Sequence, residues 1–137
     1  MLGFTLLEIL IVVIIISILS TLGFVQYGKL IEREYGRNTF AYLRAIRAAE
    51  LDHHIKNGQF TTDKDSLDLT SGIFDADNYF DVVISSGSLS DTLTVIATRN
   101  STARPSYVGS TIEFTIHVTA ADVNTIWTAS PIYESLQ

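Results

Sequence analysis

The chain has 137 residues, no cysteine and a formal net charge of −6 at neutral pH. A chain of this length supports one small domain beside any long helix, and the lack of cysteine excludes thiol catalysis and cysteine metal sites. The acidic balance disfavours nucleic-acid binding, because that binding needs clustered lysine and arginine to displace counterions.

The first predicted element is an apolar helix that begins at Phe4 and continues to Val25. At ~1.5 Å per residue, these 22 residues are long enough to cross the roughly 30 Å hydrocarbon layer of a bilayer. One carboxylate, Glu8, lies near the start of this segment. A charge inside such a helix costs about 2.5–3.5 kcal/mol, so we expect Glu8 to gain a partner.

The block Gly3-Phe4-Thr5-Leu6-Leu7-Glu8, followed by Ile9-Leu10-Ile11-Val12-Val13, resembles the processing site of type IV pilins and of type II secretion pseudopilins. The resemblance implies that a prepilin peptidase cuts between Gly3 and Phe4 and that the new amino terminus of Phe4 is N-methylated. It also implies that Glu8 contacts the amine of a neighbouring subunit during assembly. Residues 1–3 would then be the remnant of a leader. The later segments 43–50 and 57–63 look like the end of the long pilin helix and the loop after it.

The charges around the apolar segment conflict with this resemblance. Met1-Leu2-Gly3 contains no lysine or arginine, whereas Lys29 and Arg33 follow the segment. By the positive-inside rule the rest of the chain would stay in the cytoplasm. Pilin heads are translocated, so we expect the true precursor to start upstream of Met1. The segment is too long for the apolar region of a secretory signal peptide and lacks an Ala-x-Ala site.

The helix is predicted to continue to Asn57-Gly58, where glycine supplies the conformation that ends many helices. Residues 4–28 would form its membrane and filament-core half, and residues 29–57 its amphipathic half, which packs on the head. The apolar stripe of that half consists of Leu43, Ala45, Ile46, Ala48, Ala49, Leu51 and Ile55. Gly23, Gly28 and Gly36 each cost roughly 1 kcal/mol relative to alanine, so bending is expected there.

The globular head is predicted over residues 58–137, with a loop at 58–78, an antiparallel sheet at 79–128 and a C-terminal tail. Strands are expected at 79–85, 92–98, 111–119 and 122–128, and a short helical turn at 66–69. The third strand alternates between apolar and polar residues, as an antiparallel strand with one wet face does. The stretch 100–109, with Arg99, Arg104 and Pro105, is predicted to be a long exposed hairpin connection. The fold class is therefore α+β, with a long N-terminal helix packed on a small antiparallel sheet, as in pilins.

Charge divides the chain unevenly. Residues 29–56 hold six basic and four acidic residues, whereas residues 57–137 hold three basic and ten acidic residues. The head is thus predicted to have an acidic surface, which favours solubility and makes nucleic acid an unexpected partner for this subunit alone.

Two groups of side chains could bind a metal ion. His53 and His54 are adjacent, so on a helix they point about 100° apart and do not easily hold one ion. We interpret them as partly buried or solvated residues at the helix end. Loop carboxylates could bind calcium, as some pseudopilin heads do, but the EF-hand spacing is missing and acidic loops are usually just solvated. These weaker candidates are Asp63, Asp65, Asp68, Asp75 and Asp77. No other cofactor is predicted.

We predict a structural subunit of a type IV pilus-like filament, and no enzyme, because the sequence shows no convergent polar site. The expected partners are further copies of the chain in a helical filament, the prepilin peptidase and the inner-membrane assembly platform. The chain would lie in the inner membrane before assembly and in an extracellular filament at the cell surface afterwards. The alternative is a major pseudopilin of a type II secretion system, whose short fibre stays in the periplasm. A minor, tip-located pilin is also open.

Overall fold

The computed structural model describes residues 5–67, 69, 79–100 and 105–136, with residues 22–25 by their backbone only. The chain divides into two compact units, Met1–Glu34 and Tyr35–Gln137. A single helix, α1 (Leu6–Asn57), contributes its N-terminal part to the first unit and its C-terminal part to the second.

Helix α1 has 52 residues and both of its ends have local causes. At the start, the backbone N–H of Glu8 donates to the Thr5 hydroxyl at 3.3 Å, as at a helix N-cap. At the end, Gly58 adopts a φ of 73° and its N–H donates to the His54 carbonyl at 2.8 Å. Only glycine adopts this left-handed conformation without strain, so the predicted end at Asn57-Gly58 is confirmed.

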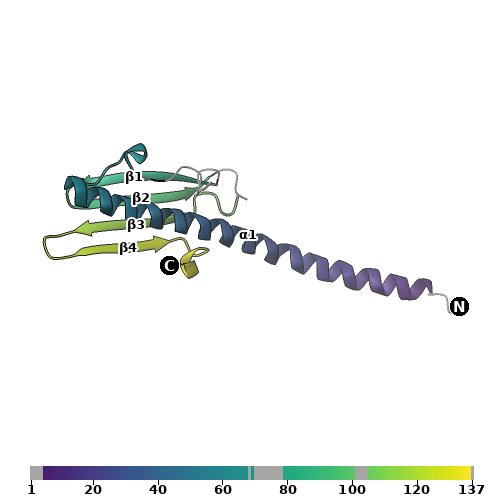
Figure 1. The fold of residues 1–137 in the computed structure, drawn as a ribbon. Helices are drawn as coiled ribbons and strands as arrows, with labels where there is room; N and C mark the ends of the chain where they lie inside the picture. Colours follow the sequence, from purple (N-terminus) through teal and green to yellow (C-terminus); the bar gives the residue numbers. More distant parts are fainter. Residues whose placement is uncertain (1–4, 68, 70–78, 101–104, 137) are drawn as a thin grey trace. The chain divides into compact units, whose positions relative to one another are not determined.

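The second unit contains a four-stranded antiparallel sheet in the order β1-β2-β3-β4 (Figure 1). Its strands are β1 (Phe80–Ser88), β2 (Thr92–Arg99), β3 (Thr111–Val118) and β4 (Val123–Ala129). Each agrees with the predicted strand to within three residues. The largest difference is at the end of β1, which continues through an irregularity between Ser86 and Ser88. The α+β fold class is confirmed.

One face of the sheet packs against α1. Trp127 of β4 lies with its ring centroid 4.5 Å from that of Phe40 on the helix and 5.0 Å from that of Phe114 on β3. Arg47 Nε of the helix donates to Thr125 Oγ1 at 2.8 Å. The buried apolar residues of the sheet and helix are Phe80, Val82, Ile84, Leu93, Val95, Ala97, Ile112, Phe114, Ile116, Phe40, Leu43 and Ile46. The predicted alternation of β3 is therefore confirmed.

The apolar stripe of the helix differs from the predicted one. Ala48 is exposed and Ile55 is 82% exposed, so neither belongs to the core. Phe60, which returns from the loop after the helix, is buried instead, with its ring 4.5 Å from that of His54. Near the end of the helix, the core is therefore completed by Phe60 from the loop and not by Ile55 of the predicted stripe.

The helical turn in the loop also lies earlier than predicted. A short 3-10 helix, η1, spans Lys64–Ser66 rather than residues 66–69. The Asp63 carboxylate accepts hydrogen bonds from Asp65 N at 3.1 Å and from Ser66 Oγ at 2.8 Å, so it caps this turn. Leu67 then adopts an extended backbone and is buried, which ends the turn before the predicted position.

Gly36, one of the expected bending points, is a close-packing position. The buried ring of Tyr133, in the segment before the 3-10 helix η3 (Glu134–Leu136), lies directly against it. A Cβ atom added at Gly36 would be 2.5 Å from Tyr133 Cδ1 and 3.0 Å from Leu136 Cδ1. The glycine therefore lets the C-terminal tail approach the helix.

Arg99 is buried, not exposed as predicted. It is the last residue of β2 and belongs to the face of the sheet that packs on α1. Its Nη1 donates to the Tyr79 carbonyl at 2.6 Å, and its guanidinium lies 5.0 Å from the ring centroid of Tyr35 and 5.3 Å from that of Phe80. Aromatic faces attract such a cation, which makes this burial tolerable. Residues 101–104 of the predicted connection lie outside the described residues.

Strand β4 forms one edge of the sheet and contains no charged residue. Beyond its two ends, Thr119 N donates to the Asp122 carbonyl and Ser130 N donates to the Thr111 carbonyl. Since antiparallel pairs alternate, the backbone groups of residues 124, 126 and 128 face β3. Those of Val123, Thr125, Trp127 and Ala129 face outward. Among the described residues, Val123 N donates to Asp122 Oδ1, whereas the outward groups of the other three have no hydrogen bond.

Glu50 is a buried carboxylate on the helix face that packs on the head. Its Oε2 accepts a hydrogen bond from Thr61 N at 3.1 Å, whereas Oε1 has no partner among the described residues. Burial raises the pKa of Glu50 above its ordinary value, and the hydrogen bond from Thr61 and the nearby His53 act in the opposite direction. The folded chain therefore holds this proton at pH values where the unfolded chain has lost it.

We expect Glu50 to make the head less stable as the pH rises. Protonated Glu50 contributes to the free energy of unfolding. This contribution is fully present below the pKa of the residue in the unfolded chain, and it is lost as the pH rises through the raised pKa of the residue in the folded chain. Glu50→Gln should remove this pH dependence, because an amide does not titrate. Urea unfolding of the full chain in detergent, followed by the fluorescence of its one tryptophan from about pH 4 to about pH 8, measures the slope. Glu134→Gln, at an exposed site of the same unit, is the matched control, and an unchanged slope in Glu50→Gln would contradict the prediction.

Candidate functional site

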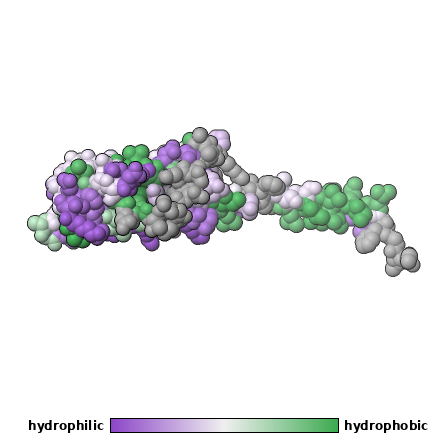
Figure 2. Space-filling model, turned by 45° about the horizontal axis from the view of Figure 1, so that its top comes forward, coloured by the Kyte–Doolittle hydropathy of each residue, from purple (hydrophilic) through white to green (hydrophobic). Residues whose placement is uncertain are grey.

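The N-terminal part of α1 presents a largely apolar surface. Every apolar side chain from Leu6 to Leu19 is exposed, from 46% at Val12 to 90% at Leu6. Figure 2 shows this surface as a run of hydrophobic residues in the first unit. Soluble monomers rarely expose apolar patches larger than a few hundred Å², so this surface needs hydrocarbon or another apolar surface to cover it.

This part of α1 is long enough and apolar enough to cross a membrane. Its few hydroxyl groups are satisfied inside the helix. Ser17 Oγ donates to the Val13 carbonyl at 2.7 Å, and Ser20 Oγ donates to the Ile16 carbonyl at 2.8 Å. These polar groups therefore need no water, which suits a helix that associates with a membrane or directs secretion.

Glu8 lies exposed in the first turn of α1. The bond from its N–H to the Thr5 hydroxyl is one half of a capping box, a pattern that the residues Thr5-Leu6-Leu7-Glu8 show in the sequence and that the sequence analysis missed. A carboxylate at a helix start also complements the positive end of the helix dipole, worth about 0.3–1 kcal/mol. Within the described residues no hydrogen bond to the Glu8 carboxylate occurs, so its acceptor capacity stays open.

The remaining two residues of the predicted processing and assembly site, Gly3 and Phe4, lie outside the described residues. The cleavage between them and the role of the Phe4 amine stay predictions. The leader remnant 1–3 lies in the same part of the chain.

Of the calcium candidates, the structure describes Asp63 and Asp65, which lie in the turn of η1. Asp63 uses both of its carboxylate oxygens to cap η1, and no three histidine, aspartate or glutamate residues among the described ones are placed to hold a metal ion. Asp68, Asp75 and Asp77 lie outside the described residues.

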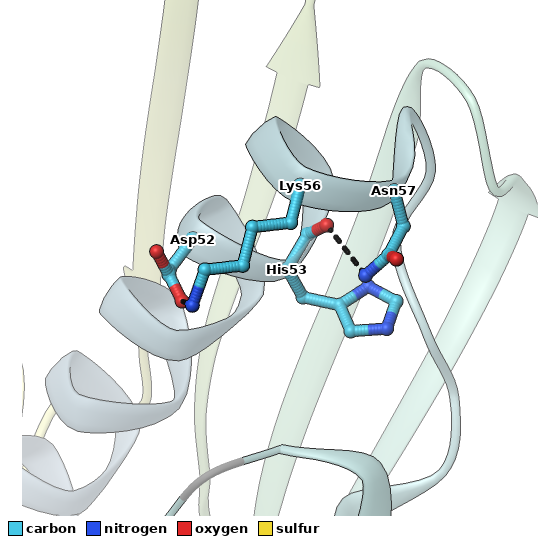
Figure 3. Close-up of polar contacts among 4 residues, drawn as sticks. All are labelled: Asp52, His53, Lys56 and Asn57. Atoms are coloured by element: carbon cyan, nitrogen blue, oxygen red, sulfur yellow. Dashed lines mark hydrogen bonds and ion pairs between the residues drawn. The ribbon is translucent and has the colours of Figure 1, made fainter.

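The two adjacent histidines hold the end of α1 in place. A ring nitrogen of His53 lies 3.0 Å from the Gln59 carbonyl, and one of His54 lies 2.8 Å from the Ser90 carbonyl. Figure 3 shows the same turn, where Asn57 Nδ2 donates to the His53 carbonyl and Lys56 forms an ion pair with Asp52 at 2.6 Å. Both histidines are partly buried, as predicted for residues at a helix end.

No family model, no curated protein and no solved structure matches the chain. The architecture is nevertheless pilin-like, because a long helix with an apolar start packs on a four-stranded antiparallel sheet.

Proposed function

We propose that this chain is the structural subunit of a type IV pilus-like filament. The observation that supports the proposal most is the contrast along α1. From Leu6 to Leu19 the helix exposes apolar side chains with one carboxylate among them, whereas its C-terminal part is packed into a folded head. Such a helix has two apolar environments open to it: a bilayer before assembly, and a bundle of identical helices afterwards.

The transfer between these environments keeps the apolar surface dry throughout, so burial of Leu6 to Leu19 holds the subunit in either place. The bilayer and the helix bundle differ in what they offer the Glu8 carboxylate. In the bilayer its carboxylate lies near hydrocarbon, whereas in a bundle it can accept a charge-assisted hydrogen bond from the Phe4 amine of a neighbouring subunit. The contact joins different surfaces of successive copies, and such a contact builds a helical filament when the rotation between copies does not close a ring.

The other roles that follow from this proposal are cleavage by a prepilin peptidase and delivery through an inner-membrane assembly platform. The product would be an extracellular filament. Electron microscopy of material sheared from cells, labelled with an antibody against the head, tests the proposal. Long fibres of this chain favour a pilus over the short periplasmic fibre of a pseudopilin, and a chain that stays monomeric in the membrane of filament-competent cells contradicts both.

Processing gives a sharper prediction. The mature subunit should begin at N-methylated Phe4, because the Gly3-Phe4 junction precedes the apolar segment and places the new amine four residues before Glu8. The intact mass of the filament subunit measures this directly. Gly3→Leu should leave the chain unprocessed and absent from filaments. A mature mass that still includes residues 1–3 would contradict the cleavage site.

A further inference from the structure

A groove lies in the second unit between α1 and the C-terminal tail. It has a volume of about 430 Å³ and is lined by Arg37, Phe40, Ala41 and Arg44 of α1 and by Ser135 and Leu136 of η3. Positions 37, 41 and 44 lie on one side of a helix. Phe40, Ala41 and Leu136 make part of the groove apolar. The two arginines line it from the side of α1.

Arg44 is the residue in the groove best placed for a ligand. Its side chain is exposed, and its guanidinium carbon lies 4.6 Å from the centroid of the Phe40 ring. The face of the ring attracts the guanidinium group of Arg44. The five N–H donors of that group stay available in a fixed fork. Such a fork binds a carboxylate through two parallel hydrogen bonds, which a lysine does not do. Two arginines line the groove, and the proposed contact uses Arg44.

The opposite end of the same unit carries exposed carboxylates. His54, near the end of α1, contacts the Ser90 carbonyl in the turn between β1 and β2. In the next turn of the sheet, Val118 N donates to the Asp91 carbonyl and Thr119 N donates to the Asp122 carbonyl. The end of α1 and both turns therefore lie together, on one side of the unit in Figure 1.

Asp91 and Asp122 are exposed in these two turns, and each keeps a carboxylate oxygen open to a partner. Asp122 Oδ1 accepts from Val123 N at 2.8 Å, and Asp91 Oδ2 accepts from Ser88 Oγ at 3.4 Å. The other oxygen of each has no hydrogen bond within the described part of the chain. Lys56, near the end of α1, is paired with Asp52. We call the turn between β1 and β2, with Asp91, and the turn between β3 and β4, with Asp122, the acidic turns.

We infer that the groove at Arg44 binds the acidic turns of a second copy of this chain. Arg44 and the end of α1 at Asn57 are 13 residues apart, which is roughly 20 Å along the helix, so the two surfaces cannot meet within one molecule. Complementary charges at opposite ends of one unit join copies head to tail, and such contacts form open arrays rather than closed dimers. Two chains that each carry −6 also repel unless an opposite-charge contact directs them. The inference rests on the proposed filament function and adds the head contact to it.

A disulfide test suits this chain because it contains no cysteine. Ala41→Cys in the groove combined with Ala121→Cys beside Asp122 keeps the charged pair and should give, on mild oxidation of intact filaments, a ladder of covalent dimers, trimers and longer chains. Either variant alone should give no ladder beyond a dimer. Filaments that form normally but yield no ladder from the double variant would overturn the inference and leave the filament function standing. Wild-type cells without filaments would instead overturn the proposed function.

Charge exchange tests the same contact without a covalent bond. Arg44→Glu should lower the yield of sheared filaments about tenfold or more, and the pair Asp91→Arg with Asp122→Arg should do the same, because like charges then meet. Combining all three changes should restore most of the yield, which misfolding would not allow. Lys64→Glu makes the same change in net charge outside the groove and should keep the wild-type yield. Arg44→Glu filaments at the wild-type yield, or no recovery in the triple variant, would overturn the inference.

Discussion

Glu8→Gln should leave the subunit in the membrane and its head folded, yet reduce filament number severely. In an apolar bundle the variant leaves the Phe4 amine of a neighbouring subunit buried without its counter-charge. Breaking a buried pair in this way costs roughly 3–5 kcal/mol, far more than the loss of an exposed ion pair. Membrane insertion should not suffer, because an uncharged amide enters hydrocarbon more easily than a carboxylate does. Counting filaments per cell by electron microscopy, with the membrane-bound pool measured in parallel, gives the result.

The helix cap provides the matched control for this experiment. Thr5→Ala removes the hydroxyl that accepts the Glu8 N–H at 3.3 Å but keeps the carboxylate, so it should cost only about 1 kcal/mol of helix stability. If Glu8 merely helps to start its own helix, the two variants should behave alike. Normal assembly by Glu8→Gln would therefore contradict the intersubunit role and support the capping role.

Gly36→Ala should destabilise the head although alanine is the better helix former. Alanine contributes roughly 1 kcal/mol through helix propensity. Its Cβ would, however, lie 2.5 Å from Tyr133 Cδ1, and the buried Tyr133 ring is backed by Phe80 at a centroid distance of 5.7 Å. Overpacking of this kind costs typically about 1–3 kcal/mol, and so short a contact belongs at the upper end. We expect a net loss of about 1–2 kcal/mol in the free energy of unfolding.

Denaturant unfolding followed by the fluorescence of Trp127 measures this loss, since that side chain packs between the helix and the sheet. Gly87→Ala is the control, because no atom lies within 4 Å of a Cβ added there. A Gly36→Ala chain more stable than wild type would mean that the C-terminal tail moves away from α1 at little cost. In that case Gly36 would act through helix propensity alone.

The sequence predicted the features that follow from periodicity. Alternation in β3 placed Ile112 and Phe114 on the inner face, and Gly58 indicated the end of α1, because each pattern has one local physical cause. The burial of Glu50 and Arg99 could not be predicted in this way, since charged residues are rarely buried without a partner from elsewhere in the chain. The partners that make both positions tolerable, Thr61 N and the Tyr79 carbonyl, come from distant segments.

The candidate site also has features that local sequence patterns indicate and features that depend on distant segments of the chain. The exposed apolar surface around Glu8 follows from composition alone, and the structure adds the cap at Thr5 that the Thr-x-x-Glu pattern could have indicated. The groove at Arg44 had no sequence signal, because it exists only where the C-terminal tail meets α1. Docking surfaces built from two separated segments require the folded chain.

The uncharged edge of β4 has a practical consequence for anyone who produces this protein. Deleting the apolar start of a membrane subunit is the common way to make its head soluble. Here that deletion leaves a second hazard, because the outward backbone groups of Thr125, Trp127 and Ala129 form a template for further strands, and β4 itself contains no charge, proline or bulge. Concentrated head preparations will therefore aggregate by strand addition. A lysine at the exposed position of Ile126 provides the missing gatekeeper without touching the core.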